Sequence, residues 1–334
     1  IMESGACTGK LWGIQDARAG SSVAAAFMDD KNASSLQQLL DLPASELASW
    51  NEHDNRTAAF FLTHALAFVD GWVMHRLPRD AIAERQVNAR RAILGANSVD
   101  TLLASSPASR AASWTVPRTA SDFVMSVYGF ARLMQYAYDV DDLDQKAFVD
   151  SVVELYPLSN YDGDAVHAFF QMDADAGVVC ATKELARQLA GAGAEVFHYA
   201  FQYGPVHNDL AARRGYATPV HDGRSRRWAS HAAELAFVFH NSCFDKHGEE
   251  FCVSNKNTEE WPRAANVLSA RMMQAWGSFA RGRHPNIEGQ PLWSAVRGDD
   301  NETSMPTYIF DAPKVYSSTG YRDSICSFWS TTIG

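Results

Sequence analysis

The sequence lacks several features that would narrow its class at once. None of its five cysteines forms a Cys-x-x-Cys pair, which weakens a zinc or thioredoxin interpretation. No apolar run approaches the roughly 20 residues that span a bilayer, and no low-complexity tract is visible. Because 29 Lys and Arg face 39 Asp and Glu, the net charge is −10, which argues against nucleic acid or an anionic membrane as the main partner. We expect no metal and no cofactor.

Its length and composition are those of an ordinary globular protein. The 334 residues allow one large α/β domain or two smaller ones, and 46% are hydrophobic while 20% are charged. No internal repeat or clear domain linker is present. The chain starts at Ile1 without a visible signal peptide, and Ile1–Gly5 resembles the end of a strand more than a free terminus. We therefore expect the natural protein to continue upstream.

Hydrophobic patterning predicts an α/β fold, because short apolar strands alternate with helical segments. The expected strands are residues 1–2, 91–100, 195–203 and 306–311. The expected helices are residues 15–50, most of 104–176, 181–190 and 268–281. In the last helix, Met272, Met273, Trp276 and Phe279 form a stripe typical of a core face. So few parallel strands for this length indicate that further strands of the sheet lie upstream.

Two polar residues draw attention beside apolar segments. Asp100 closes the 91–100 strand, and α/β sheets place their sites at the carboxyl ends of strands. His231 precedes Glu234 by three residues, and the apolar run Leu235–Phe239 follows. A lone histidine beside an apolar helix is usually structural, so neither residue indicates a function by itself.

Seven segments, in order, together resemble the type-B carboxylesterase and cholinesterase-like family of α/β-hydrolases. Ile1–Gly5 resembles a strand followed by "QSG", Phe68–Gly71 resembles "PVxDG", and Ile93–Asp100 resembles the strand and turn carrying the acid. The others resemble "xxCP", "HxxELxxVFG", "WxxFAxxGxPN" and "CxFW"; they are residues 178–181, 228–239, 275–286 and 326–329. The resemblance implies an α/β-hydrolase fold in which residues 1–334 are the C-terminal three-fifths of one domain. The N-terminal strands, the oxyanion loop and the nucleophile elbow would be missing.

The resemblance further implies ester hydrolysis by a Ser–acid–His triad, with Asp100 as the acid and His231 as the histidine. Imidazole titrates near neutrality, so it can take the serine proton and return it to the leaving alcohol. A buried carboxylate on the other ring nitrogen fixes the tautomer. Ser4 matches a serine that donates a hydrogen bond behind the acid, and Glu234 would be an ion-pair or hydrogen-bond partner near the histidine.

The nucleophile is the main departure from that family. No G-x-S-x-G occurs, so the serine must come from an upstream segment or a companion chain, and we expect this chain alone to be inactive on its small ester substrate. Gly5–Gly9 has elbow spacing around Cys7, but only two residues of strand precede it, which favours a turn with a small buried cysteine. Leu103 and Ala104 stand where cholinesterases carry aromatic residues, which argues against choline esters.

Cysteines and sequons favour an oxidising compartment. Cys180 and Cys326 match a family disulfide, and we also pair Cys243 with Cys252 because they flank a short polar insertion. Cys7 is left over. The three N-x-S/T sequons are Asn32, Asn55 and Asn301. Together these features predict a secreted or lumenal glycoprotein, and analogy with the family adds a possible homo-oligomer.

Two alternatives stay open. The chain could belong to a non-catalytic cholinesterase-like domain used for adhesion or assembly, because some members of this family have lost the triad. It could also be an unrelated α/β protein in which Asp100 and His231 are structural. That second alternative predicts that the two side chains lie far apart.

Overall fold

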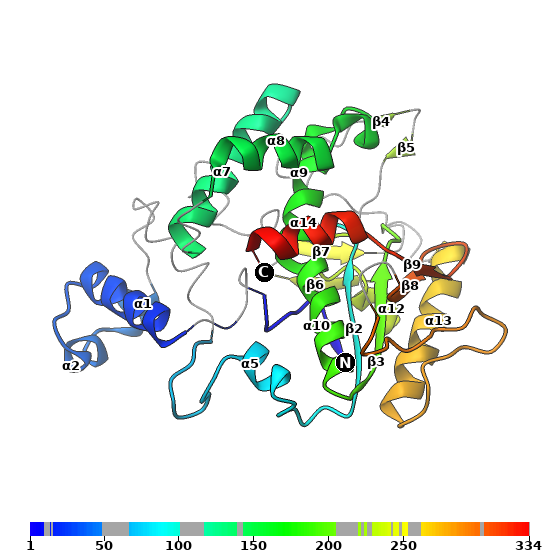
Figure 1. The fold of residues 1–334 in the computed structure, drawn as a ribbon, viewed down its shortest axis with the longest axis horizontal. Coiled ribbons are helices and arrows are strands. Elements are labelled where there is room, and N and C mark those ends of the chain that lie inside the picture. The colour runs from blue at the N-terminus through cyan, green and yellow to red at the C-terminus, as the bar shows by residue number, and fades with distance from the viewer. Residues whose placement is uncertain are drawn as a thin grey trace.

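A computed structural model describes most of the chain around a central β-sheet. The described residues are 1–9, 14, 16–48, 67–100, 117–138, 143–204, 220–221, 224–225, 229–241, 243–246, 249–252, 262–300 and 304–333. Within them, the largest sheet has five strands in the order β1-β2-β3-β8-β9 (Figure 1). These strands are β1 (Met2–Glu3), β2 (Arg91–Asn97), β3 (Glu195–Phe201), β8 (Pro306–Phe310) and β9 (Tyr316–Thr319).

The sheet is mostly parallel. β1, β2, β3 and β8 run in one direction, and only β9 pairs antiparallel with β8. The β2–β3 register runs from Arg91 opposite Glu195 to Asn97 opposite Phe201, so both strands reach their carboxyl ends at the same edge. This arrangement confirms the α/β class and the four expected strands. β9 was not predicted, because its four residues are polar and mostly exposed.

Side chains alternate between two covered faces of the sheet, as expected for strands buried on both sides. Ile93, Phe197 and Tyr199 pack with α12 (Leu235–Val238) and α13 (Arg263–Ala280) on one face. Leu94 and Val196 pack on the other face, in the same cluster as residues of α5 (Pro78–Ala83) and α10 (Cys180–Gly191). Both central strands are therefore almost wholly buried.

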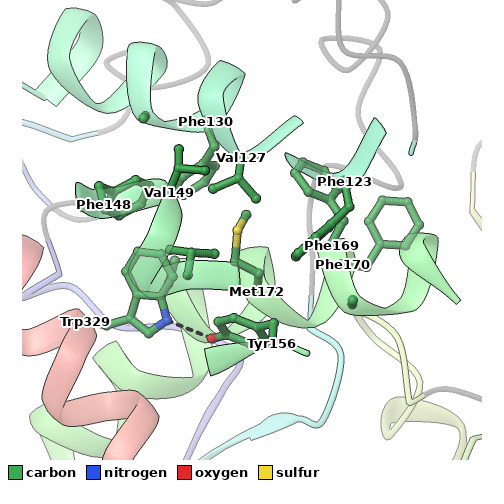
Figure 2. Packing of buried hydrophobic residues seen from close by; sticks show 14 of the residues in the cluster. Phe123, Val127, Phe130, Phe148, Val149, Tyr156, Phe169, Phe170, Met172 and Trp329 are labelled. Atoms are coloured by element: carbon green, nitrogen blue, oxygen red, sulfur yellow. Dashed lines mark hydrogen bonds between the residues drawn. The ribbon is translucent and has the colours of Figure 1, made fainter. Parts of the chain in front are cut away.

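A separate helical layer has its own aromatic core, shown in Figure 2. Its helices are α7 (Ala120–Tyr138), α8 (Gln145–Leu155), α9 (Ala165–Ala174) and the C-terminal α14 (Asp323–Ile333). A 3₁₀ helix (Leu158–Tyr161) precedes α9, and a π-helical turn (Asp175–Val179) joins α9 to α10. Asp144 and Asp164 cap α8 and α9 by accepting hydrogen bonds from backbone N–H groups of the first turn.

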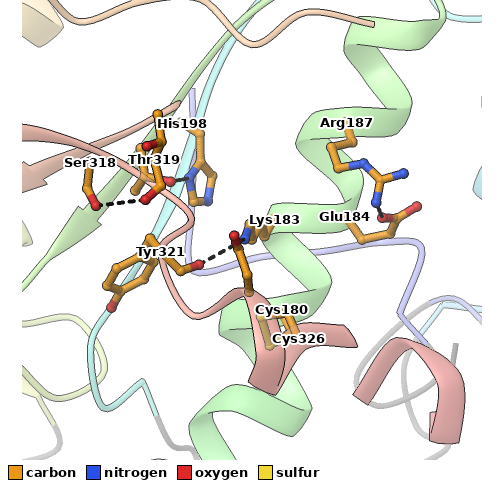
Figure 3. Close-up of polar contacts among 11 residues, drawn as sticks. Cys180, Lys183, Glu184, Arg187, His198, Ser318, Thr319, Tyr321 and Cys326 are labelled. Atoms are coloured by element: carbon orange, nitrogen blue, oxygen red, sulfur yellow. Dashed lines mark hydrogen bonds and ion pairs between the residues drawn. A yellow bond between two sulfur atoms is a disulfide. The ribbon is translucent and has the colours of Figure 1, made fainter. Parts of the chain in front are cut away.

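A disulfide between Cys180 and Cys326 joins the start of α10 to α14, which is the pairing that the resemblance implied. Figure 3 shows it beside Lys183, which donates to the Tyr321 carbonyl oxygen over 2.8 Å and pairs with Asp323. The bond spans 146 residues. Closing a loop of that length stabilises the folded state by about 5 kcal/mol in the chain-entropy model.

The remaining described helices and strands belong to neither the central sheet nor the helical layer. They are α1 (Ala17–Asp30), α2 (Leu36–Leu40), α3 (Ala44–Ala48), the β4–β5 pair (Val220–His221 and Arg224–Ser225) and the β6–β7 hairpin (Cys243–Lys246 and Glu249–Cys252). α13 begins at Arg263 rather than near residue 268, directly after an extended Pro262. The core stripe expected on it was partly wrong, because Met272 and Trp276 are buried whereas Met273 is exposed. Among the described helices, none combines the length and apolar character needed to cross a membrane.

Candidate active site

Asp100 lies in a tight turn at the carboxyl end of β2, and its side chain is fully buried. One carboxylate oxygen, Oδ2, accepts a hydrogen bond of 2.9 Å from the backbone N–H of Asn97 and another from the Ser4 hydroxyl. The turn is also held by its backbone, because the Ser98 N–H donates to the Phe201 carbonyl oxygen at the end of β3. The sheet therefore presents this carboxylate at the edge where parallel α/β sheets place their sites.

His231 lies between β5 and α12 in the chain, beside the turn that carries Asp100. Val99 and Ser230 form an isolated parallel bridge, and the Val99 N–H donates to the Ala229 carbonyl oxygen over 3.0 Å. Ala232, the next residue, has a φ of 68°, which L residues other than glycine rarely adopt. A strained backbone conformation of this kind persists only where the surrounding contacts hold it in place, and such conformations cluster at functional sites.

The two side chains meet directly. His231 Nδ1 lies 2.8 Å from the second carboxylate oxygen of Asp100, Oδ1. Because a carboxylate only accepts, Nδ1–H is the donor, and the neutral ring then carries its lone pair on Nε2. The His231 side chain is 26% exposed, so one edge of the ring remains accessible while the acid is enclosed. If the chain were an unrelated α/β protein in which the two residues are merely structural, their side chains should lie far apart, and this contact contradicts that prediction.

Ser4 and Glu234 form a second layer behind the acid. Ser4 follows β1 with a φ of 56°, and its hydroxyl donates to Asp100 and lies 3.5 Å from Glu234 Oε1. Glu234 is 1% exposed, and its Oε2 accepts from the Asn97 side-chain amide. Among the described residues, Glu234 makes hydrogen-bond contacts with Asn97 and Ser4 and forms no ion pair.

Burial, and after it the nearby negative charge of Asp100, raise the pKa of Glu234 to about 8. Glu234 is therefore mainly neutral at pH 7 and can donate its own proton toward the Ser4 oxygen. That leaves the Ser4 hydrogen for Asp100, so the hydrogen bonds run in one direction from Glu234 through Ser4 to the acid. The negative charge of the cluster is then concentrated on the carboxylate that faces His231.

Asn97 is the site residue that sequence reasoning missed. Its backbone N–H contacts Asp100 and its side-chain amide contacts Glu234, so one residue orients both carboxyl groups. The available signal was a polar side chain at the end of an otherwise apolar buried strand.

The structure describes only some of the other cysteines and predicted glycosylation sites. Cys7 lies in a turn after β1 as a half-buried free thiol, and burial raises its pKa, which keeps it protonated and disfavours a nucleophile. The β6–β7 register places Cys243 opposite Cys252, although their side chains lie outside the described part. Asn32 is exposed, at the turn after α1. The other two sequons, Asn55 and Asn301, lie outside the described residues. So do Leu103 and Ala104, which stand where cholinesterases carry aromatic residues.

Comparison with known proteins gives one consistent family. A model described as "Carboxylesterase family" matches residues 1–329. Carboxylesterase 3 of Pongo abelii is 26% identical over 275 residues, which cover 79% of this chain and 42% of that protein. The medium-chain fatty acyl-CoA hydrolase precursor of Anas platyrhynchos is 27% identical over 242 residues, covering 70% and 37%. Acylcarnitine hydrolase of Mus musculus is 27% identical over 240 residues, covering 70% and 36%. The chain spans about two fifths of the length of these relatives.

Proposed function

Because this chain belongs to the carboxylesterase family and has its α/β-hydrolase fold, we propose that it is the acid- and histidine-bearing part of a carboxylic-ester hydrolase. Asp100 and His231 act as two members of a Ser–Asp–His triad, and the serine belongs to a segment outside residues 1–334. The observation that carries the proposal is the 2.8 Å contact between His231 Nδ1 and the buried Asp100 carboxylate.

This geometry supplies what acyl transfer needs from a base. With Nδ1–H held by Asp100, the free Nε2 lone pair can take the proton of a serine hydroxyl as that oxygen attacks the ester carbonyl. The resulting imidazolium lies against an ionised carboxylate, which stabilises it, and then returns the proton to the leaving alcohol. Water repeats the sequence on the acyl-enzyme and releases the carboxylic acid.

In the described part of the chain, no serine hydroxyl forms a hydrogen bond with His231, which supports a nucleophile from another segment. Ser4 lies beside the acid, but its hydroxyl donates to Asp100 Oδ2, whereas His231 contacts the other carboxylate oxygen, Oδ1. Cys7 is disfavoured by its raised pKa. These observations support a serine contributed by an upstream segment or companion polypeptide, with residues 1–334 as an incomplete single domain.

The relatives suggest a substrate class. Two of them are named for hydrolysis of acyl esters or thioesters, as a fatty acyl-CoA hydrolase and an acylcarnitine hydrolase. We propose a small carboxylic ester as the substrate of the whole protein, with no cofactor. The disulfide between Cys180 and Cys326 supports a secreted or lumenal location, since such bonds persist in oxidising compartments.

The proposal is tested with the whole protein from its native source, treated with a fluorophosphonate probe that labels activated serines. We expect the label on a serine outside residues 1–334. His231→Gln and Asp100→Asn should slow labelling by about 10³-fold or more, because the triad members act as a unit. His284→Gln is the matched control, since His284 forms an exposed contact of 3.7 Å with Glu195 and should label at the normal rate.

The alternative is a non-catalytic adhesion or assembly domain that kept its acid and histidine. It predicts no labelling of the wild-type protein although the upstream segment is present. That result would refute the hydrolase, and equal labelling of the Asp100→Asn variant would refute the assigned triad.

A further inference from the structure

The peptide unit between Ser98 and Val99 connects the turn that carries Asp100 (the acid turn) to the loop that carries His231 (the histidine loop). The carbonyl of Ser98 and the N–H of Val99 belong to the same planar group and point in opposite directions. The Val99 N–H donates to the Ala229 carbonyl oxygen, two residues before His231. Any rotation of this peptide plane would therefore change both the path of the acid turn and its link to the histidine.

The other side of that peptide is held by a side chain from a different layer. Gln171 lies on α9 and is 6% exposed, and its Nε2 donates to the Ser98 carbonyl oxygen over 2.6 Å. The same Nε2 lies 3.3 Å from Asp175 Oδ1, one helical turn further along. Both partners are acceptors, so both contacts require the amide nitrogen to face them, which fixes the orientation of the amide.

Asp175 is in turn anchored to the C-terminal part of the chain. It is fully buried at the start of the π-helical turn and forms an ion pair with Arg322, just before α14. Tyr156 donates its hydroxyl to Asp175 over 3.0 Å and accepts from the Trp329 indole over 2.8 Å, a contact visible in Figure 2. Asp175 therefore cannot follow a displaced Gln171, and the amide is held between two fixed points.

We propose that Gln171 is a positioning residue for the triad, which fixes the Ser98–Val99 peptide plane and thereby the separation of Asp100 and His231. This inference rests on the proposed function. The hydrogen bond also polarises the peptide whose N–H reaches the histidine loop, so the two bonds strengthen each other. Residue 171 touches neither substrate nor the reacting atoms.

Gln171→Met tests the proposal, because methionine keeps the length and unbranched shape of the side chain but removes the donor. The matched control is Gln135→Met. Gln135 lies on α7 and also donates its amide to a backbone carbonyl, that of Leu143, over 2.9 Å. Both variants lose one side chain–backbone hydrogen bond in the helical layer, and both should unfold at a lower temperature than the wild type.

The two variants are compared in the whole protein by hydrolysis of p-nitrophenyl butyrate, with active sites counted by fluorophosphonate titration. We expect Gln171→Met to lower kcat per titrated site by about tenfold, with KM within about twofold of the wild type, since small misplacements of catalytic groups have effects of this size. Gln135→Met should keep kcat per titrated site unchanged. A purely structural role would lower the number of active sites in both variants but not the rate at each site.

The outcomes separate the two proposals. If the wild type is active and the two variants have equal kcat per site, the positioning role is refuted while the hydrolase stands. If the wild type neither labels nor hydrolyses the ester, both fall together. Should Gln171→Met not fold, Tyr156→Phe replaces it, because it removes a hydroxyl that fixes Asp175 and keeps the packed ring. A smaller drop in kcat per site then supports the proposal, and no drop refutes it.

Discussion

The buried carboxyl of Glu234 should make the stability of this protein depend on pH in an unusual direction. An acid whose pKa is higher in the folded state than in the unfolded chain binds a proton more tightly when folded. Its contribution is complete below the unfolded value of 4.5 and is lost as the pH rises through the folded value of about 8. Replacing it with glutamine, which cannot ionise, removes this dependence.

The size of the effect follows from the same values. One pKa unit corresponds to about 1.36 kcal/mol, so by pH 7 the wild type has lost about 3 kcal/mol of unfolding free energy that Glu234→Gln retains. Glutamine also fits the site, because its carbonyl can accept from the Asn97 amide and its own amide can donate to Ser4. We therefore expect equal stabilities near pH 4.5 and a more stable variant at pH 7.

The assay is urea unfolding followed by tryptophan fluorescence at several pH values, with the variant and the wild type measured side by side. Taking the difference cancels the titration of every group that does not interact with Glu234. Glu288→Gln serves as the control, because Glu288 lies exposed in a loop and its replacement should change stability by less than about 0.5 kcal/mol. A difference between Glu234→Gln and wild type that does not grow between pH 5 and 7 would show that Glu234 is ionised in the folded protein, and the assigned direction of its hydrogen bonds would be wrong.

Three further predictions concern packing, the disulfide and modification. A Cβ on Gly95 would lie 2.2 Å from Cδ1 of the Tyr199 ring, so Gly95→Ala should lower the unfolding free energy by about 1–3 kcal/mol. Gly191→Ala is the control: a Cβ there would have its nearest neighbour 4.0 Å away, so the Tm should change little. Cys326→Ser should lower the unfolding free energy by several kcal/mol, up to about 5, and an equal Tm in reductant and oxidant would contradict the disulfide. If the protein follows the secretory route, the exposed Asn32 should carry a glycan that peptide N-glycosidase F removes, and Asn32→Gln should abolish the mass shift at that peptide.

The sequence alone determined the class of fold and the identity of the central strands. The runs around Ile93 and Phe197 are apolar on both faces, and only strands covered by helices on both sides of a sheet can bury such runs. Motif order pointed to Asp100 and His231 without any geometry, because the chemistry of ester hydrolysis restricts which residue types can fill those positions. β9 and the start of α13 escaped prediction, since short polar strands and proline-led helix starts carry little periodic signal.

Only the tertiary structure decided how the site is held together. Asn97 and Gln171 are unremarkable in sequence, and although the family motif placed Glu234 near the histidine, a polar residue beside an apolar run gives no sign of its partner. Their hydrogen bonds join segments far apart in the chain, as when Asn97 meets Glu234 or Gln171 meets Ser98. Burial raises the pKa of Glu234 because of what encloses it, and no local pattern encodes that enclosure. The residue types that do chemistry can be read from the sequence, whereas the protonation and orientation of the groups around them depend on contacts that exist only after folding.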